Sequence, residues 1–179
     1  MICRENSASV RGAAMPQGAG GFRPAFMRGR DAGRCGKEVS MDKEMIGRMI
    51  DLATDQLQAA YAPYSHFKVG AALLTKGQKL YTGCNIENAA YTPTNCAERT
   101  AFFKAVSEGE REFEAICIVG GKEGVLTDFA PPCGVCRQVM MEWCRPEEFQ
   151  IILARSREDY QVCSLAELLP QGFGPGNLD

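Results

Sequence analysis

Two segments decide the fold of this chain, Asn95-Cys96-Ala97-Glu98-Arg99-Thr100 and, further along, Pro131-Pro132-Cys133-Gly134-Val135-Cys136-Arg137-Gln138. Their three cysteines can bind one zinc ion and leave the fourth position of its tetrahedral coordination to a water molecule. Because a single residue separates Glu98 from Cys96, the carboxylate is placed to handle that water's proton. The sequence therefore predicts a catalytic zinc site, with Cys96, Cys133 and Cys136 as ligands of one Zn2+ per subunit.

Two other kinds of site use the Cys133-x-x-Cys136 spacing, a structural zinc site and a redox pair. A structural zinc needs a fourth protein ligand, but the only histidine of the sequence, His66, lies outside both segments. A redox pair leaves the Cys96-x-Glu98 pattern without explanation. We therefore expect an open, catalytic site.

Each metal-binding segment is expected to begin a helix. The apolar spacing predicts helices over 96–108 and 133–144, the first ending at Gly109 and the second before Pro146. A helix N-terminus offers unpaired N–H groups and the positive end of the helix dipole, which lower the pKa of a nearby thiol. The thiols of both metal-binding segments are therefore expected to have a lowered pKa.

The rest of the chain shows the patterns of an α/β fold. An amphipathic helix is predicted over 42–60, with Asp42 as its cap and Pro63 beyond its end. Apolar runs predict four strands, at 67–75, 79–86, 114–119 and 149–154. The first two form a hairpin, and short strand–helix–strand connections favour parallel pairing of the others. We predict a three-layer α-β-α sandwich with a mixed sheet and helices on both faces.

The first forty residues differ from the rest of the chain. Residues 1–40 hold seven basic and three acidic residues, so they carry +4 while the remainder carries −6 of the net charge of −2. They show no apolar period, so we expect a disordered basic N-terminal extension followed by one domain over 41–179. Such a leader also resembles an organelle transit peptide or a nucleic-acid-binding arm, but an inert tail or an upstream translation start is the simpler interpretation.

Composition restricts the protein class. Nine cysteines occur in 179 residues, but the first residues show no signal-peptide pattern, so we expect reduced thiols and a cytoplasmic protein. The sequence has no apolar run of the roughly 18 residues that a membrane helix requires. We expect no membrane partner.

Two further segments add a resemblance to a known family. They are Gly83-Cys84-Asn85-Ile86-Glu87-Asn88-Ala89 and the ending Leu168-Leu169-Pro170-x-x-Phe173. Together with the two cysteine segments they resemble the zinc-dependent cytidine deaminases of the small homotetrameric type, over about residues 61–173. The resemblance implies the cytidine deaminase fold and hydrolytic deamination of cytidine and 2′-deoxycytidine to uridine and 2′-deoxyuridine plus ammonia, in pyrimidine salvage.

The resemblance also implies roles for the residues beside the zinc. Glu98 would take a proton from the zinc-activated water, pass it to the cytosine ring nitrogen and then protonate the departing amine. Three thiolates make the metal centre negative, and Arg99 matches an arginine that donates hydrogen bonds to ligand sulfurs in the family. Arg137 can do the same, and for either residue a solvated surface arginine is the alternative.

Further residues are expected to bind the nucleoside. Asn85 and Glu87 match the pair that hydrogen-bonds the ribose hydroxyls, and alternation along a strand sends both to one face. Phe67 matches an aromatic residue that packs on the nucleoside, although its spacing also fits a core strand residue. The backbone of Ala97 is expected to contact the base edge.

Two aromatic residues are expected to act across subunits. Phe173 lies in a Gly-rich ending that looks like a frayed tail, but the resemblance implies that its ring stacks on the pyrimidine in a neighbouring subunit's site. Tyr91, in the loop before Cys96, is expected to contribute in the same way. Both expectations require a homotetramer with shared active sites.

Three alternative functions remain. An aminonucleoside-antibiotic deaminase of the blasticidin S type shares both zinc segments, but the Asn85-x-Glu87-Asn88 segment and Phe173 favour cytidine. A polynucleotide deaminase usually has His as the first ligand and needs a basic channel, whereas the folded part here is acidic, so we expect no nucleic-acid partner. A non-catalytic zinc-binding module would not account for Glu98 beside an open coordination position.

Overall fold

A five-stranded mixed sheet forms the centre of the molecule, in the order β2-β1-β3-β4-β5. The computed structural model describes residues 41–178, so the prediction made for residues 1–40 lies outside the described residues. The strands are β1 (Phe67–Thr75), β2 (Leu80–Cys84), β3 (Phe113–Lys122), β4 (Gln150–Ala154) and β5 (Tyr160–Ser164). Only the β3–β4 pair is parallel among these five described strands, and the other three neighbouring pairs are antiparallel.

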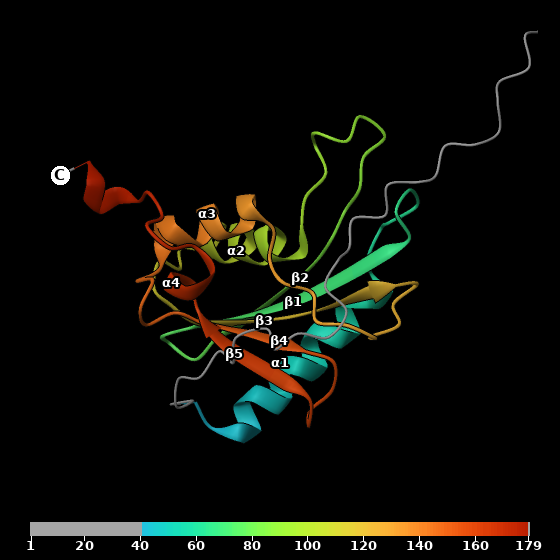
Figure 1. The fold of residues 1–179 in the computed structure, drawn as a ribbon, viewed down its shortest axis with the longest axis horizontal. Coiled ribbons are helices and arrows are strands. Elements are labelled where there is room, and N and C mark those ends of the chain that lie inside the picture. The colour runs from blue at the N-terminus through green and yellow to red at the C-terminus, as the bar shows by residue number, and fades with distance from the viewer. Residues whose placement is uncertain (1–40, 179) are drawn as a thin grey trace, which may run out of the picture. The chain divides into compact units, whose positions relative to one another are not determined.

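Helices cover both faces of this sheet (Figure 1). One face carries α1 (Lys43–Asp55), and the other carries α2 (Ala97–Ser107), α3 (Gly134–Trp143) and the short α4 (Leu165–Leu168). The prediction of a three-layer α-β-α sandwich with a mixed sheet is therefore confirmed. Two short 3-10 helices, Gln56–Gln58 and Pro175–Asn177, extend the chain after α1 and near its C-terminus.

Strand alternation builds the two cores that hold the layers together. In β3, Ile116 and Ile118 pack toward α2 and α3, whereas Cys117 and Val119 pack toward α1. The central strands are buried on both faces, which is why they read as continuous apolar runs in the sequence. Fully burying each such side chain contributes about 1.5–3 kcal/mol to the free energy of unfolding, so the two cores fix the layers firmly.

The sequence-based prediction missed two elements and misplaced some ends. β5 and α4 were not predicted, and the first helix ends at Asp55 rather than continuing regularly to residue 60. Asp42 occupies the N-cap position of α1, but its side chain makes no capping hydrogen bond. The helix start therefore depends on packing of the buried face of α1 more than on its cap.

Gly83 sets the distance between β2 and the helix that begins at the first predicted zinc ligand. A Cβ atom at Gly83 would lie 2.4 Å from the carbonyl oxygen of Ala97 and 2.6 Å from the amide nitrogen of Ala101. Only a residue without a side chain permits such a close approach of strand and helix backbone. The start of α2, and with it the site described below, is fixed against the sheet through this contact.

The described cysteines and helices also bear on the predicted cellular setting. No helix among residues 41–178 is long and apolar enough to cross a membrane. Six cysteines are free thiols, as predicted: Cys84, Cys96, Cys117, Cys133, Cys136 and Cys144. Cys163 is not one of these six free thiols.

Candidate active site

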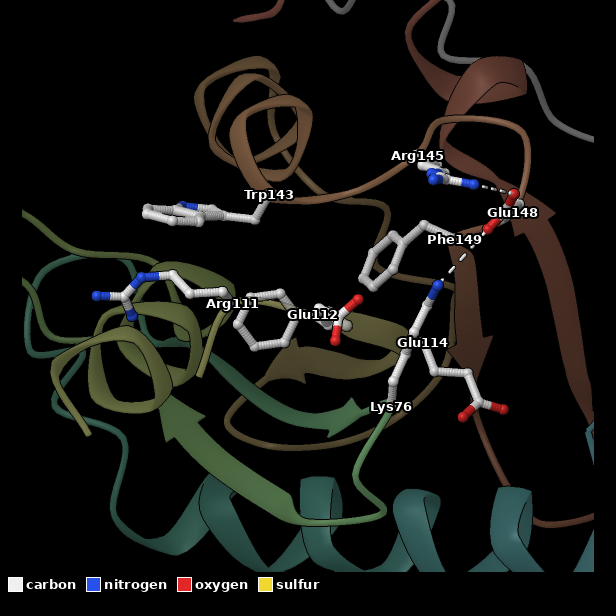
Figure 2. Close-up of a pocket in the computed structure, with 9 residues that line it drawn as sticks. Lys76, Arg111, Glu112, Glu114, Trp143, Arg145, Glu148 and Phe149 are labelled. Carbon is white, nitrogen blue, oxygen red and sulfur yellow. Dashed lines mark hydrogen bonds and ion pairs between the residues drawn. The ribbon is translucent and has the colours of Figure 1, made fainter. Parts of the chain in front are cut away.

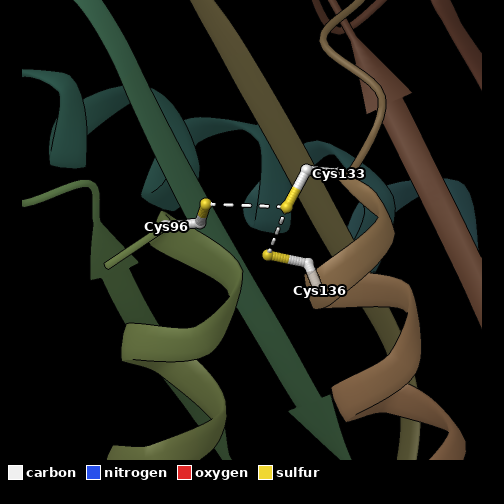
Figure 3. A group of neighbouring side chains, drawn as sticks. All are labelled: Cys96, Cys133 and Cys136. Atoms are coloured by element: carbon white, nitrogen blue, oxygen red, sulfur yellow. Dashed lines mark hydrogen bonds between the residues drawn. The ribbon is translucent and has the colours of Figure 1, made fainter. Parts of the chain in front are cut away.

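The three predicted zinc ligands meet where α2 and α3 begin (Figure 3). Cys96 is the N-cap of α2 and Cys133 is the N-cap of α3, while Cys136 lies in the first turn of α3. The Sγ atoms of Cys96 and Cys133 are 3.8 Å apart, and those of Cys133 and Cys136 are 3.5 Å apart. All three sulfurs lie within 4.8 Å of one another.

This geometry fits a zinc ion. Thiolates bound tetrahedrally at the Zn–S distance of about 2.3 Å would have sulfurs about 3.8 Å apart, close to the separations observed. Within residues 41–178, no other His, Cys, Asp or Glu side chain joins this group of possible ligands. Three protein ligands correspond to a catalytic zinc site, whereas structural sites have four.

The Arg99 guanidinium lies against the first of these thiols. Its Nη2 atom donates to the Thr94 carbonyl oxygen at 2.9 Å and to the Cys96 sulfur at 3.7 Å. Hydrogen bonding from the Cys136 thiol, and then from Arg99, lowers the pKa of Cys96. This contact supports the predicted role of Arg99, because a neighbouring cation stabilises thiolate charge.

Glu98 is buried beside the cluster. It is only 4% exposed, and it lies in the first turn of α2, two residues after Cys96. Burial raises the pKa of its carboxyl group to about 7, although hydrogen bonds from its own backbone amide and from the Cys136 thiol act in the opposite direction. A carboxyl group with a pKa near neutrality can both accept and return a proton.

Arg137 has other partners than those predicted. Its Nε atom donates to the Pro132 carbonyl oxygen at 2.8 Å, and its Nη1 atom donates to the Leu168 carbonyl oxygen at 2.5 Å. Both nitrogens are therefore directed at backbone oxygens rather than at the zinc-binding sulfurs. These hydrogen bonds therefore do not show the contact with ligand sulfurs that was considered for Arg137. Leu168, at the end of α4, supplies a carbonyl oxygen within reach of the guanidinium, and α4 was not predicted.

Asn85 and Glu87 come just after β2, where Asn85 hydrogen-bonds the first residues of β1 and Glu87 hydrogen-bonds the segment that leads into β1. The Asn85 side chain accepts from the Val69 amide at 2.8 Å and donates to the Phe67 carbonyl oxygen at 2.8 Å. Glu87 accepts from the Tyr64 amide at 2.9 Å and from the Ser65 hydroxyl at 2.5 Å. Each side chain keeps part of its hydrogen-bonding capacity for a ligand. The hydrogen bonds from Ser65 and Tyr64 lower the pKa of the Glu87 carboxyl group, so Glu87 stays ionised.

A cleft of about 330 Å³ opens beside Glu87. It is lined by Tyr64, Ser65, Glu87, Tyr91 and Thr94. The rings of Tyr64 and Tyr91 lie 6.2 Å apart. The structure thus brings Tyr91 close to Glu87, and it adds Ser65 and Thr94, which sequence reasoning missed because ordinary loop residues carry no periodic signal.

The remaining predicted site residues differ in their exposure. Ala97 is fully buried at the first position of α2, with its carbonyl oxygen against Gly83. Phe67 is 42% exposed at the start of β1, so it is not a core residue of this chain. Phe173 is 57% exposed beyond α4. Both exposed rings are available for contacts with a ligand or another subunit.

A second cleft, of about 180 Å³, shares no residue with the predicted site (Figure 2). Trp143 lies at its edge with the Arg111 guanidinium 5.4 Å from the ring centroid. Glu148 forms ion pairs with Lys76 at 3.8 Å and with Arg145 at 3.2 Å. Three of the charged side chains of this cleft are thus joined in one ion-pair group, which distinguishes the cleft from the thiol cluster.

Comparison with known proteins agrees with this geometry. Residues 43–152 match the family model described as the cytidine and deoxycytidylate deaminase zinc-binding region. The cytidine deaminase of Sporosarcina psychrophila is 49% identical over 133 residues, which are 74% of this chain and 94% of that protein. The cytidine deaminase of Halalkalibacterium halodurans is 47% identical over 133 residues, covering 74% of this chain and 95% of that protein.

Solved structures give the same result. The crystal structure of cytidine deaminase from Burkholderia pseudomallei superposes with a TM-score of 0.64 at 46% identity, covering 70% of this chain and 97% of that one. Cytidine deaminase from Mycobacterium tuberculosis has a TM-score of 0.62 at 36% identity, covering 75% and 98% respectively. With the thiol cluster and the buried Glu98, these matches decide the family. The chain belongs to the cytidine and deoxycytidylate deaminases.

Proposed function

We propose that this chain converts cytidine and 2′-deoxycytidine, with one water molecule, into uridine and 2′-deoxyuridine plus ammonia, as a step of pyrimidine salvage. The observation that carries the proposal is the buried Glu98 carboxyl group beside a three-thiol cluster with an open fourth position. A non-catalytic zinc module has no use for a carboxyl group held in this way, because its burial is costly.

The reaction divides between the metal and the protein side chains. A zinc ion held by Cys96, Cys133 and Cys136 would supply Lewis-acid activation of water. Glu98 accepts one proton of the water and delivers it to the cytosine ring nitrogen as the water oxygen adds to the amino-bearing carbon. It then takes the second proton of that oxygen and gives it to the amine, which leaves as ammonia while the carbonyl group of uridine forms. Arg99, which contacts the Cys96 sulfur, offsets the negative charge of the thiolates during these steps.

The other predicted residues bind the nucleoside in this proposal. The Asn85 amide exchanges hydrogen bonds with the ribose hydroxyls, and the ionised Glu87 carboxylate accepts hydrogen bonds from them. The Ala97 backbone contacts the base edge. Phe67 packs on the nucleoside, and Tyr91 and Phe173 complete the site across subunits of a homotetramer. The exposure of all three aromatic rings is compatible with this arrangement, because each ring is accessible to a ligand or to another subunit.

The cytoplasm is the proposed location. In the part of the chain that the structure describes, six cysteines are free thiols, and the proposed zinc site needs three of them reduced.

The function is tested by following the ultraviolet absorbance of cytidine and 2′-deoxycytidine, with zinc measured on the same sample. We expect loss of both nucleosides and about one zinc per chain. The panel includes blasticidin S and a single-stranded polynucleotide. Turnover confined to either of these, or zinc without any turnover, would reject the proposal in favour of the matching alternative.

Phe173→Ala tests the shared site. If the ring stacks on the pyrimidine, its loss removes about 1–3 kcal/mol of stacking, by analogy with stacking on nucleic-acid bases. The KM for cytidine should then rise by about ten- to a hundredfold, with zinc content unchanged. An unchanged KM would remove Phe173 from the site.

Mixed oligomers of Phe173→Ala and Glu98→Gln decide whether the ring comes from a neighbour. Some pockets of such mixtures combine an intact Glu98 with a Phe173 donated by another subunit. Specific activity should therefore exceed the sum of the two parent proteins. Absence of recovery in verified mixed oligomers would place Phe173 in its own subunit's site or outside any site.

A further inference from the structure

The segment after α4 is held against α3, the helix that carries two of the zinc ligands. We call residues 169–174 the C-terminal arm; Figure 1 shows the chain running past α3 here before it ends. The Nε2 atom of Gln138 donates to the carbonyl oxygen of Phe173 at 2.8 Å, across 35 positions of sequence. The backbone of Phe173 is thereby tied to the residue that lies two positions after Cys136.

Arg137 ties the beginning of the arm to the same helix turn. Its Nη1 atom donates to the Leu168 carbonyl oxygen, directly before the arm, and its Nε atom donates to the Pro132 carbonyl oxygen. Pro132 precedes the zinc ligand Cys133. One guanidinium group thus joins the loop that enters α3 to the end of α4.

Close packing fixes the arm between these two hydrogen bonds. A Cβ atom at Gly172 would lie 2.9 Å from Leu169 Cδ2 and 3.1 Å from Met141 Sδ, and one at Gly174 would lie 3.3 Å from Met141 Cε. The Gly172 amide also donates to the Leu169 carbonyl oxygen at 3.2 Å. The two glycines therefore let the arm backbone lie directly on α3.

The result is a fixed backbone with an exposed ring. The hydrogen bond from the Gly172 amide to Leu169 lies before Phe173. The Gly174 amide donates to Asn177 Oδ1 at 2.8 Å after it, so hydrogen bonds restrain the chain on both sides of the Phe173 side chain. Yet that side chain is 57% exposed. A ring held in place before it meets its target loses less conformational freedom on binding, and this strengthens the contact.

We propose that Gln138 and Arg137 are positioning residues that hold the C-terminal arm on α3 and so determine where Phe173 is presented to a neighbouring site. The inference rests on the proposed function, because it takes Phe173 to contact the pyrimidine. It gives Arg137 a role that its observed hydrogen bonds support. The proposal also links two neighbouring active sites, since the helix turn that holds the zinc ligands of one subunit would orient the Phe173 ring used in the site of another.

Gln138→Met tests the proposal without disturbing the core, because Gln138 is exposed and Met has similar length but no donor. Removing one hydrogen bond of this kind should raise the KM for cytidine by about three- to tenfold. The kcat should change by less than about twofold, and zinc content should stay the same. Gln58→Met is the matched control, with the same change at an exposed glutamine beyond α1, and it should leave the KM unchanged.

A double mutant separates positioning from a general structural effect. In the Phe173→Ala background, Gln138→Met should cause no further rise in KM, because the ring through which it acts is gone. A rise of the same size in both backgrounds, or no rise in the wild-type background, would overturn the proposal.

Hydrogen exchange of residues 169–178 in the substrate-free protein gives a readout that does not depend on activity. Gln138→Met should accelerate exchange there by at least about threefold relative to Gln58→Met, since the arm is released more often. Unchanged exchange would overturn the docking role even in an active enzyme. Accelerated exchange in a protein that does not deaminate cytidine would instead locate the failure in the proposed function.

Discussion

Glu98→Gln is expected to lower the turnover of cytidine by at least ~100-fold while zinc and nucleoside still bind. The amide keeps the size and the hydrogen-bonding shape of the carboxyl group, but it cannot accept the proton that the water must lose. Because a neutral amide is less costly to bury than a carboxylate, the substitution should not destabilise α2. Single-turnover and steady-state assays, with zinc analysis and a thermal melt on each sample, measure these effects.

Glu108→Gln is the matched control for that experiment. Glu108 is the exposed C-cap of the same helix, so this substitution makes the same chemical change at the far end of α2 from the thiol cluster. Its turnover should remain close to that of the wild type. Near-normal turnover in a folded, zinc-loaded Glu98→Gln protein would exclude Glu98 as the proton carrier.

The architecture was largely predictable because its strands are short, apolar and separated by clear turn signals. The bounds 67–75 and 149–154 were predicted to within a residue, and the parallel β3–β4 pair followed from the helix between those strands. The zinc ligands were equally accessible, because ligand spacing and helix starts coincide at Cys96 and Cys133. Chemistry that depends on local spacing can be inferred from sequence.

The two missed elements differ in the local pattern that they carry. β5 is an edge strand of five residues, Tyr160–Ser164, whose polar Gln161 and Ser164 interrupt the apolar run that marked the equally short β4. The start of α4 did carry one, since Ser164 and Glu167 form a reciprocal capping box of the type Ser-x-x-Glu. Without α4, the Leu168 carbonyl oxygen could not be identified as a partner of Arg137, so a contact with the ligand sulfurs and a solvated surface position both remained open.

Long-range hydrogen bonds explain the rest of the difference. Phe173 could be assigned to a frayed tail or to a neighbouring site, and only the Gln138 contact shows that its backbone is held in place. In the same way, nothing in the sequence indicates that Ser65 binds the Glu87 carboxylate 22 positions away. Such contacts exist only after the layers have packed, so the sequence can suggest the residues but not their partners.

Cys133→Ala is expected to abolish zinc binding and reduce turnover to background. Cys133 is the most exposed of the three ligands and the sulfur that lies within 3.8 Å of both others, so its loss leaves only Cys96 and Cys136. Two thiolates with no third protein ligand do not form a catalytic zinc site. Elemental analysis after dialysis against a weak chelator, together with the cytidine assay, measures the loss.

Cys144→Ala provides the control, because it makes the same change at a free, buried thiol at the C-cap of the same helix, α3. Removing that sulfur from the core lowers stability by opening a small cavity, but the helix start and the three ligands remain. Cys144→Ala should therefore keep one zinc per chain and most of its activity, even if it melts at a lower temperature. Metal binding and folding free energy are linked, so Cys133→Ala should also lose the stabilisation that added zinc gives the wild type. Full zinc occupancy in Cys133→Ala would show that the metal is held elsewhere and would remove the three-thiol cluster as the centre of the proposed reaction.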